Sequence, residues 1–164
     1  MKVMAKFAPL VVLLFCASSA AQGADKVPIS AVPQRVRAAI EDFVPGAQLI
    51  EVKVSDDRVY KRVFNCTYFR NIHLGSIKLT YKGELLDIDE ALVIDDVPPR
   101  VREVIHRETK GGLIKRIRLD ALYGHLVYRV KAYYSKSTNI EISLTISRSG
   151  HIVERKVSQG LLIF

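Results

Sequence analysis

The sequence contains little cysteine and none of the short motifs that mark common catalytic sites. Only two cysteines occur in 164 residues, Cys16 and Cys66. Cys16 lies in an N-terminal segment that we expect to be removed, and one remaining thiol cannot form a disulfide within the chain. No HExxH, CxxC or glycine-rich phosphate loop is present. These absences argue against the familiar metallopeptidase, dithiol redox and nucleotide-binding classes. Because Cys66 follows an apolar stretch, we expect a buried structural thiol; a reactive or dimer-forming thiol is the alternative.

The remaining candidate metal ligands do not form a recognisable site. The four histidines are scattered, with no pair three or four residues apart. We expect His125 and His151 in turns, and His73 and His106 on exposed faces. The acidic residues cluster once, over residues 87–96. Their spacing begins like that of a calcium-binding loop at residues 87–89 but does not continue in that pattern. We interpret this cluster as a solvated linker and helix cap, and we predict no catalytic residue, cofactor or metal.

The N-terminal residues have the order of a secretory signal peptide. A basic start is followed by the apolar run 7–15 and by the small residues 17–21. Because a membrane span needs about 20 apolar residues, this run is too short to be one. We therefore expect a signal peptide over residues 1–23, cleaved near Ala21 or Gly23, and a periplasmic or secreted protein. A buried N-terminal helix is the alternative.

The positive charge is concentrated in the second half of the chain. The net charge is +8. Residues 25–94 carry ten basic and ten acidic side chains, whereas residues 95–164 carry thirteen basic and seven acidic ones. This asymmetry indicates that any anionic partner contacts the second half.

The sequence also repeats itself. Residues 32–40 and 97–105 match at an offset of 65, each beginning with Val-Pro, and Gly83 corresponds to Gly150 later in the chain. Each copy begins with a short amphipathic helix that opens with proline, for which Ser30 and Asp96 are candidate N-caps.

Alternating apolar and polar residues then predict antiparallel strands with one wet face. Residues 113–121, 126–133 and 140–147 alternate most clearly, and glycine-containing turns precede the last strand of each copy. Strand boundaries between Val59 and Leu74 are poorly determined, because that stretch is richer in aromatics and less regular. We expect an α+β fold, a tandem repeat of a helix packed on a four-stranded antiparallel sheet. The expected copies span residues 27–92 and 95–158, followed by an apolar C-terminal tail at 159–164.

These features resemble the PepSY-like family, small secreted α-β4 domains that often occur in tandem. The residues that carry the resemblance are the Val-Pro helix openings, the helix end near Gly46, the alternating strands, and a glycine turn before an apolar pair. The second copy departs from it at residues 109–112. The resemblance implies the arrangement of the β-lactamase-inhibitor proteins, whose tandem sheets line one concave surface able to grip another protein. It also implies an inhibitory or folding-control role.

The wet face of the second sheet is the best candidate for a binding site. If strands 113–121 and 126–133 pair as a hairpin, four cations and a tyrosine share one face. These predicted partner-binding residues are Arg116, Arg118, Arg129, Lys131 and Tyr133. Like charges placed opposite each other destabilise a sheet, and an acidic partner would relieve that cost. Protection of the sheet against aggregation is the alternative explanation of such cations.

We therefore predict an exported, non-catalytic binding module, inhibitor-like or regulatory, whose partner is an acidic envelope protein. The alternative is a binder of an anionic envelope component, such as a lipid headgroup or a polyanionic glycan. Nucleic acid is not expected as a partner, since an exported protein rarely meets it and no aromatic stacking ladder accompanies the cations.

Overall fold

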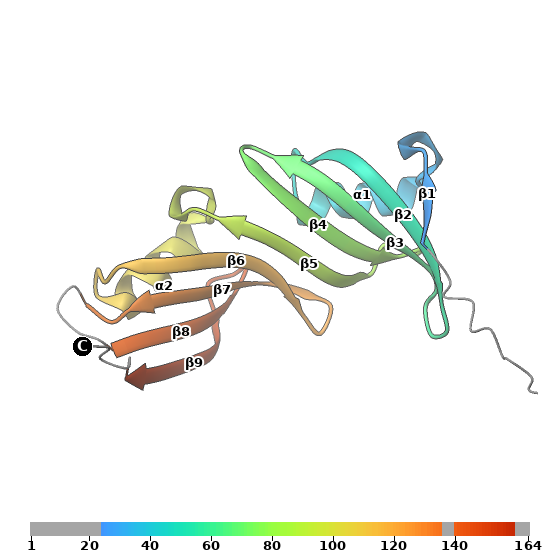
Figure 1. Ribbon diagram of the computed structural model, residues 1–164. Coiled ribbons are helices and arrows are strands. Elements are labelled where there is room, and N and C mark those ends of the chain that lie inside the picture. Colours follow the sequence, from blue (N-terminus) through green and yellow to red (C-terminus); the bar gives the residue numbers. More distant parts are fainter. Residues whose placement is uncertain (1–23, 136–139, 160–164) are drawn as a thin grey trace, which may run out of the picture.

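The protein consists of antiparallel strands with two short helices (Figure 1). The computed structural model describes residues 24–135 and 140–159, so the expected signal peptide and the tail beyond Gln159 lie outside the described residues. The strands are β1 (Asp25–Val27), β2 (Gln48–Asp57), β3 (Lys61–Arg70), β4 (His73–Thr80), β5 (Leu85–Leu92), β6 (Ile114–Leu122), β7 (His125–Tyr133), β8 (Ile140–Ser147) and β9 (Ile152–Gln159). The helices are α1 (Gln34–Phe43) and α2 (Pro99–Thr109), each preceded by a 3-10 turn, η1 (Ile29–Ala31) or η2 (Ile94–Asp96).

All nine strands form one antiparallel sheet in chain order from β1 to β9. The expected fold class, a tandem repeat of a helix on a four-stranded sheet, is therefore wrong. Strands β5 and β6 pair through Glu90 with Leu119, Ala91 with Arg118 and Leu92 with Ile117, which joins the two halves of the chain. Two separate sheets would leave backbone donors and acceptors unpaired at these edges, and the joint sheet satisfies them. The predicted domain boundaries, 27–92 and 95–158, remain predictions.

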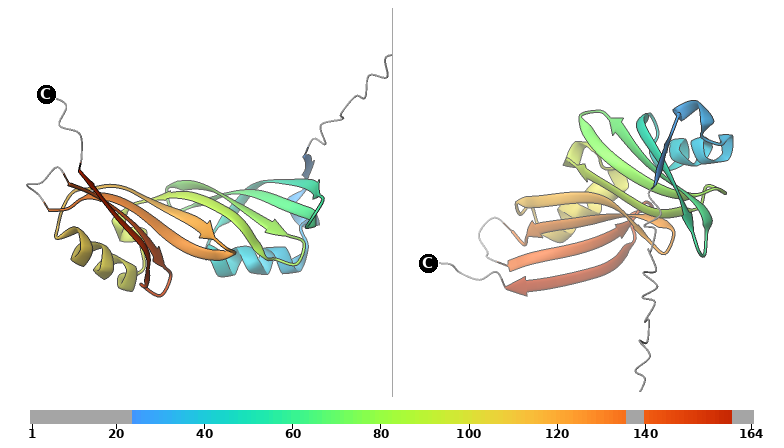
Figure 2. Two further views of the ribbon diagram at one scale, coloured as in Figure 1. Left: turned by 90° about the horizontal axis from the view of Figure 1, so that it is seen from below. Right: turned by 45° about the vertical axis from the view of Figure 1, so that its right-hand side comes forward.

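Both helices lie against the same face of the sheet, and the other face carries no helix (Figures 1 and 2). Val36 and Ile40 of α1, and Val101 and Ile105 of α2, are buried against the strands. The predicted caps are wrong, because the N-cap positions are Pro33 and Pro98 and neither makes a side-chain cap hydrogen bond. Proline has no amide hydrogen to lose and presets a suitable φ, so it suits the start of a helix. We call the helix-free surface the open face.

Two glycine turns bring the sheet close to the helices. Gly83, between β4 and β5, has a φ of +87°, and a Cβ there would lie 3.0 Å from the Ala39 Cβ of α1. Gly150, between β8 and β9, has a φ of +86°, and its Cβ would lie 3.3 Å from the Arg100 carbonyl oxygen of α2. Glycine suits both positions because it alone combines this backbone conformation with so close an approach. The predicted turns are confirmed.

The core lies between the sheet and the helices, and the predicted alternation places its residues correctly. Ile117, Leu119, Val130 and Leu144 are buried on the helix side. Cys66 on β3 is fully buried, and desolvation raises the pKa of its thiol to about 11. The expectation of a buried structural thiol is thereby confirmed.

Candidate partner-binding face

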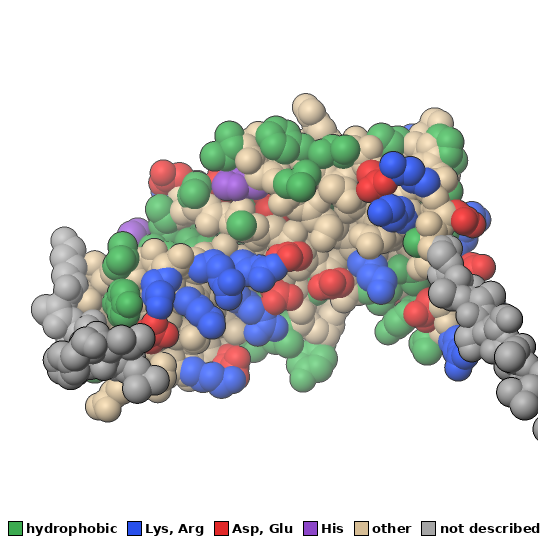
Figure 3. All heavy atoms as spheres, in the orientation of Figure 1, with side chains coloured by type: hydrophobic (Ala, Val, Ile, Leu, Met, Phe, Trp, Pro, Cys, Tyr) green, Lys and Arg blue, Asp and Glu red, His purple; other side chains and the backbone are tan. Residues whose placement is uncertain are grey.

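The open face is divided by chemistry along the sheet. In Figure 3, lysine and arginine side chains gather over the strands from β6 to β9, carboxylates lie beside them near the junction of the two halves, and hydrophobic side chains lie above, toward the hairpin of β3 and β4. No helix covers these groups (Figure 2). The face therefore presents basic and apolar surface next to each other.

The hairpin of β6 and β7 brings the predicted cations together. Arg116 is the cross-strand partner of Lys131, and Arg118 is the partner of Arg129. Tyr133 lies further along β7, opposite Glu141 of β8, with the Lys115 ammonium 5.0 Å from the centre of its ring. The predicted hairpin is thus observed, and its register places the four cations in two directly opposed pairs.

Internal ion pairs neutralise one of these two pairs. Arg118 donates to Asp89 of β5, with Nε 2.8 Å from Oδ1, and Arg129 pairs with Asp120 of β6. The hydrogen bond and charge of Asp89 raise the pKa of the Arg118 guanidinium above its ordinary value. Over residues 24–135 and 140–159, Arg116 and Lys131 are exposed and have no carboxylate within 4.0 Å. At longer range, Lys115 and then Lys131 lower the pKa of Glu141, which is itself paired with Lys115. The opposed pair Arg116 and Lys131 is therefore the free positive charge of the predicted set.

An apolar cluster that sequence reasoning missed adjoins these cations. Phe69, Ile72 and Leu74, on and around the turn between β3 and β4, are 41%, 79% and 63% exposed. Phe69 and Leu74 are cross-strand partners on the open face. The aromatic composition of this stretch was visible in the sequence, but its irregular alternation did not show which side chains face outward. We call Phe69, Ile72 and Leu74 the apolar cluster.

An open depression of about 290 Å³ lies where the apolar cluster meets the cations. It is lined by Leu74, Asp89, Ala91, Arg116 and Arg118. Ala91, on β5, is exposed, and its small side chain lies between larger neighbours on either side. The depression therefore combines an apolar wall with a positively charged one.

A buried polar network lies at the junction on the opposite, helix-bearing face. The Tyr68 hydroxyl donates to Glu90 Oε2 at 2.8 Å, and Arg70 donates to both Glu90 oxygens at 3.1 and 2.8 Å. The Glu90 side chain is fully buried. Desolvation, and then the bond to Glu90, raise the pKa of the Tyr68 phenol. A Cβ on Gly75 would lie 2.7 Å from Tyr68 Cε2, so only glycine leaves room for this ring.

This network overturns the interpretation of residues 87–96 as a solvated linker. Asp87, Asp89 and Glu90 belong to strand β5, where the first two point outward and Glu90 points into the core. Two guanidinium hydrogen bonds and one phenol hydrogen bond compensate the burial of the Glu90 carboxylate. The acidic cluster is thus part of the sheet that joins the two halves.

His73 was predicted on an exposed face and instead forms a partly buried pair. Its Nε2 lies 2.7 Å from Asp96 Oδ2, and Asn71 Nδ2 donates to Asp96 Oδ1 at 3.0 Å. Burial opposes the charge on Asp96, but the bonds from His73 and Asn71 outweigh it and lower the pKa of the carboxyl. These bonds tie the β3–β4 turn to the segment before α2. His106, His125 and His151 are exposed, and His125 begins β7 rather than lying in the turn.

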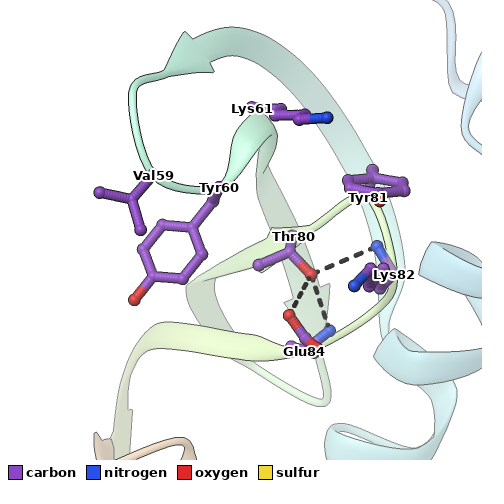
Figure 4. Close-up of a pocket in the computed structure, with 7 residues that line it drawn as sticks. All are labelled: Val59, Tyr60, Lys61, Thr80, Tyr81, Lys82 and Glu84. Carbon is purple, nitrogen blue, oxygen red and sulfur yellow. Dashed lines mark hydrogen bonds between the residues drawn. The ribbon is translucent and has the colours of Figure 1, made fainter.

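A second depression, of about 230 Å³, lies between two turns at the far end of the first half (Figure 4). It is lined by Val59, Tyr60, Lys61, Thr80, Tyr81, Lys82 and Glu84. The Thr80 hydroxyl donates to Glu84 Oε2 at 3.1 Å and accepts the amides of Lys82 and Glu84, each at 3.2 Å. These polar groups hold the turn together.

Two further searches of the described residues bear on the site. No group of three or more histidine, cysteine, aspartate or glutamate side chains there is placed to hold a metal ion. The helices within those residues are all too short or too polar to cross a membrane.

Comparison with known proteins gives only distant similarity. No protein-family model matches the sequence, and no curated protein matches it. The structure is similar to a DUF2874 family protein from Bacteroides uniformis, with 16% identity and a TM-score of 0.44 over 76% of this chain and 88% of that one. It is also similar to a BLIP-like protein from Bacteroides fragilis, with 12% identity and a TM-score of 0.45 over 80% and 90% of the two chains.

A third similar structure is a Bacteroides eggerthii protein provisionally described as periplasmic. It shares 13% identity, with a TM-score of 0.44 over 78% of this chain and 90% of that one. At these scores no property of the three proteins is transferred to this chain. The similarity to the PepSY-like family stays a resemblance.

Proposed function

We propose that this protein is an exported, non-catalytic binding protein of the bacterial periplasm, inhibitor-like or regulatory, whose open face binds an acidic protein. The observation that carries the proposal is the pair Arg116 and Lys131. The two cations face each other across adjacent strands and have no carboxylate within 4.0 Å in the described part of the chain. Their neighbours Arg118 and Arg129 are each neutralised by an aspartate.

Unpaired like charges in direct opposition lower the stability of a sheet, by about 0.2–1 kcal/mol per pair. A carboxylate placed between Arg116 and Lys131 would remove that repulsion and gain two charge-assisted hydrogen bonds. The apolar cluster beside them favours a protein over a bare polyanion, because exposed apolar patches rimmed by polar residues mark protein contacts.

The test uses a fluorescent polyglutamate peptide and the double substitution Arg116→Glu with Lys131→Glu. We expect the affinity of this variant to fall at least about tenfold and its dependence on salt to flatten, because steering and pairing charges are lost. The matched control is Lys61→Glu with Lys82→Glu, which changes the net charge equally at the far depression and should leave the affinity within about twofold.

Equal losses in both double variants would mean that only net charge matters, and the proposed face would be wrong. Vesicles of phosphatidylglycerol and a sulfated glycan are tested beside the peptide. Preferential binding of either one, lost in the Arg116 and Lys131 variant, would replace the acidic protein with an anionic envelope component as partner.

A further inference from the structure

Phe69 and Leu74 of the apolar cluster belong to one continuous row of side chains across the open face. This row ends at the paired arginines Arg118 and Arg129, and the free cations Arg116 and Lys131 lie in the next outward-facing row. Phe69 pairs with Leu74 across β3 and β4, Ala91 pairs with Arg118 across β5 and β6, and Arg118 pairs with Arg129. The pairing of Gly75 with Glu90 places the preceding Leu74 beside the following Ala91. The row therefore runs without a break from an aromatic ring to a guanidinium group.

The depression lies over the smallest side chain of this row, Ala91. Ala91 lies between Leu74 on one side and Arg118 on the other, with Arg116 one outward-facing position along β6. Leu74 is 63% exposed, so its apolar side faces the depression and solvent rather than the core. Such a site has room for one apolar side chain between Leu74 and the arginines, and it cannot satisfy a carboxylate except at the arginine side.

The charges around the depression set the orientation of an occupant. Asp89 lies on the same rim but is already paired with Arg118. Arg116, with Lys131 behind it, is the positive group left for a ligand. An occupant that brings a carboxylate to Arg116 and Lys131 therefore brings the adjoining part of its surface over Ala91 and Leu74.

We infer that the open face recognises a polypeptide segment in which an apolar side chain stands next to acidic residues. The apolar side chain fills the depression over Ala91, and the carboxylates bind Arg116 and Lys131. This inference rests on the proposed function and narrows its partner from any acidic protein to one with this composite surface. The complementarity is of charge on one side of the site and of apolar contact on the other.

The test compares two short polyglutamate peptides, one with a central leucine and one with a central serine, by anisotropy and by backbone NMR of the protein. We expect the leucine peptide to bind about tenfold more tightly, because its leucine side chain buries apolar surface in the depression and the serine side chain does not. Its resonance shifts should include Leu74, Ala91 and Arg116.

Two substitutions separate the depression from the charges. Ala91→Phe fills the depression at an exposed position without changing charge, so it should abolish the preference for the leucine peptide over the serine peptide. Leu74→Ser should reduce the preference, whereas Val59→Ser, at another exposed apolar position far from the site, should not.

Equal affinity for the two peptides, with both affinities sensitive to Arg116 and Lys131, would overturn this inference and leave the proposed function standing. No binding of either peptide would overturn both. Binding of phosphatidylglycerol vesicles and of neither peptide would also overturn both. It would mean that the apolar cluster contacts a membrane surface.

Discussion

The two halves of the sheet use the same backbone devices and present different side chains. In each half a glycine with positive φ brings a turn against a helix, Gly83 against α1 and Gly150 against α2. On the open face, the first half carries exposed apolar groups such as Leu74, and the second half carries the unpaired cations Arg116 and Lys131. Packing on the helix side thus sets the architecture, while the chemistry of binding depends on outward-facing positions that packing leaves free.

The junction strand β5 contains both kinds of position in consecutive residues. Asp89 points outward and pairs with Arg118, whereas Glu90 points inward and binds Tyr68 and Arg70. Removing each carboxylate in turn therefore separates the contribution of the buried network to stability from that of an ion pair on the surface.

The largest effect is expected for Glu90→Ala. The substitution leaves the Arg70 charge and the Tyr68 hydroxyl without their buried partner, so the free energy of unfolding should fall by about 3–5 kcal/mol. Urea denaturation followed by circular dichroism measures it. The matched control is Asp89→Ala, at an exposed ion pair, which should cost about 1 kcal/mol or less. Equal losses for the two would show that the buried network does not stabilise the junction.

The glycine turns give the next largest effect. Gly46 has a φ of +75° with nothing within 4 Å of a built Cβ, whereas at Gly83 the added methyl would press on Ala39. Gly46→Ala should cost about 1–2 kcal/mol from backbone strain alone. Gly83→Ala should cost at least about 1 kcal/mol more, because it also overpacks the contact with α1. Thermal unfolding of both variants provides the comparison, and a smaller loss at Gly83 would contradict it.

The hydrogen bonds of Asp96 connect the β3–β4 turn to the segment before α2, and their contribution to the free energy of unfolding should depend on pH. Asp96→Asn should lower the free energy of unfolding by about 1 kcal/mol at neutral pH. Because the pKa of Asp96 is lowered in the folded protein, its contribution is complete above the ordinary aspartate pKa of about 3.9 and disappears as the pH falls through the folded value.

The difference in stability between Asp96→Asn and the unsubstituted protein should accordingly shrink in acid. Asp95→Asn is the control, since that side chain is 87% exposed and its nearest Arg102 nitrogen is 3.8 Å away. A difference that persisted undiminished at strongly acidic pH would mean that the Asp96 charge is not what stabilises this connection.

The smallest effect has the opposite sign. Lys131→Gln removes the repulsion from Arg116 and should raise the free energy of unfolding by about 0.2–1 kcal/mol while weakening the binding of polyglutamate. Lys53→Gln in the first half is the control, because that ammonium lies 3.6 Å from Glu51 and its loss should not stabilise the protein. If Lys131→Gln lowered the free energy of unfolding, repulsion between Arg116 and Lys131 would not be a destabilising factor in this sheet.

Much of the second half could be predicted from the sequence, because its strands alternate regularly. The alternation of residues 113–121 and 126–133 was enough to place the four cations on one face of a hairpin, whereas the pairing of Arg116 with Lys131 follows from the register of the two strands. The pairing of Arg118 with Asp89 could not be predicted, because the acidic residues around β5 look like a solvated linker as long as the neighbouring strands are unknown.

The first half and the junction were harder to predict for a physical reason. Glu90 is buried only because Arg70 and Tyr68, at least 20 residues away in sequence, arrive beside it. The exposure of Leu74 follows from the register of β3 and β4, and the irregular alternation there did not fix that register. Side-chain environments that depend on distant strands are set by pairing, which local patterns do not encode.

The strictly sequential strand order has a consequence for how the protein folds. Each strand pairs with the one before it and the one after it in the chain, so no strand is inserted between two others that formed earlier. Most pairings close through a short turn, which costs little chain entropy and favours rapid folding for a sheet of this size. The sheet can grow one hairpin at a time, and fraying of β1 or β9 at its edges leaves the pairing of the central strands intact.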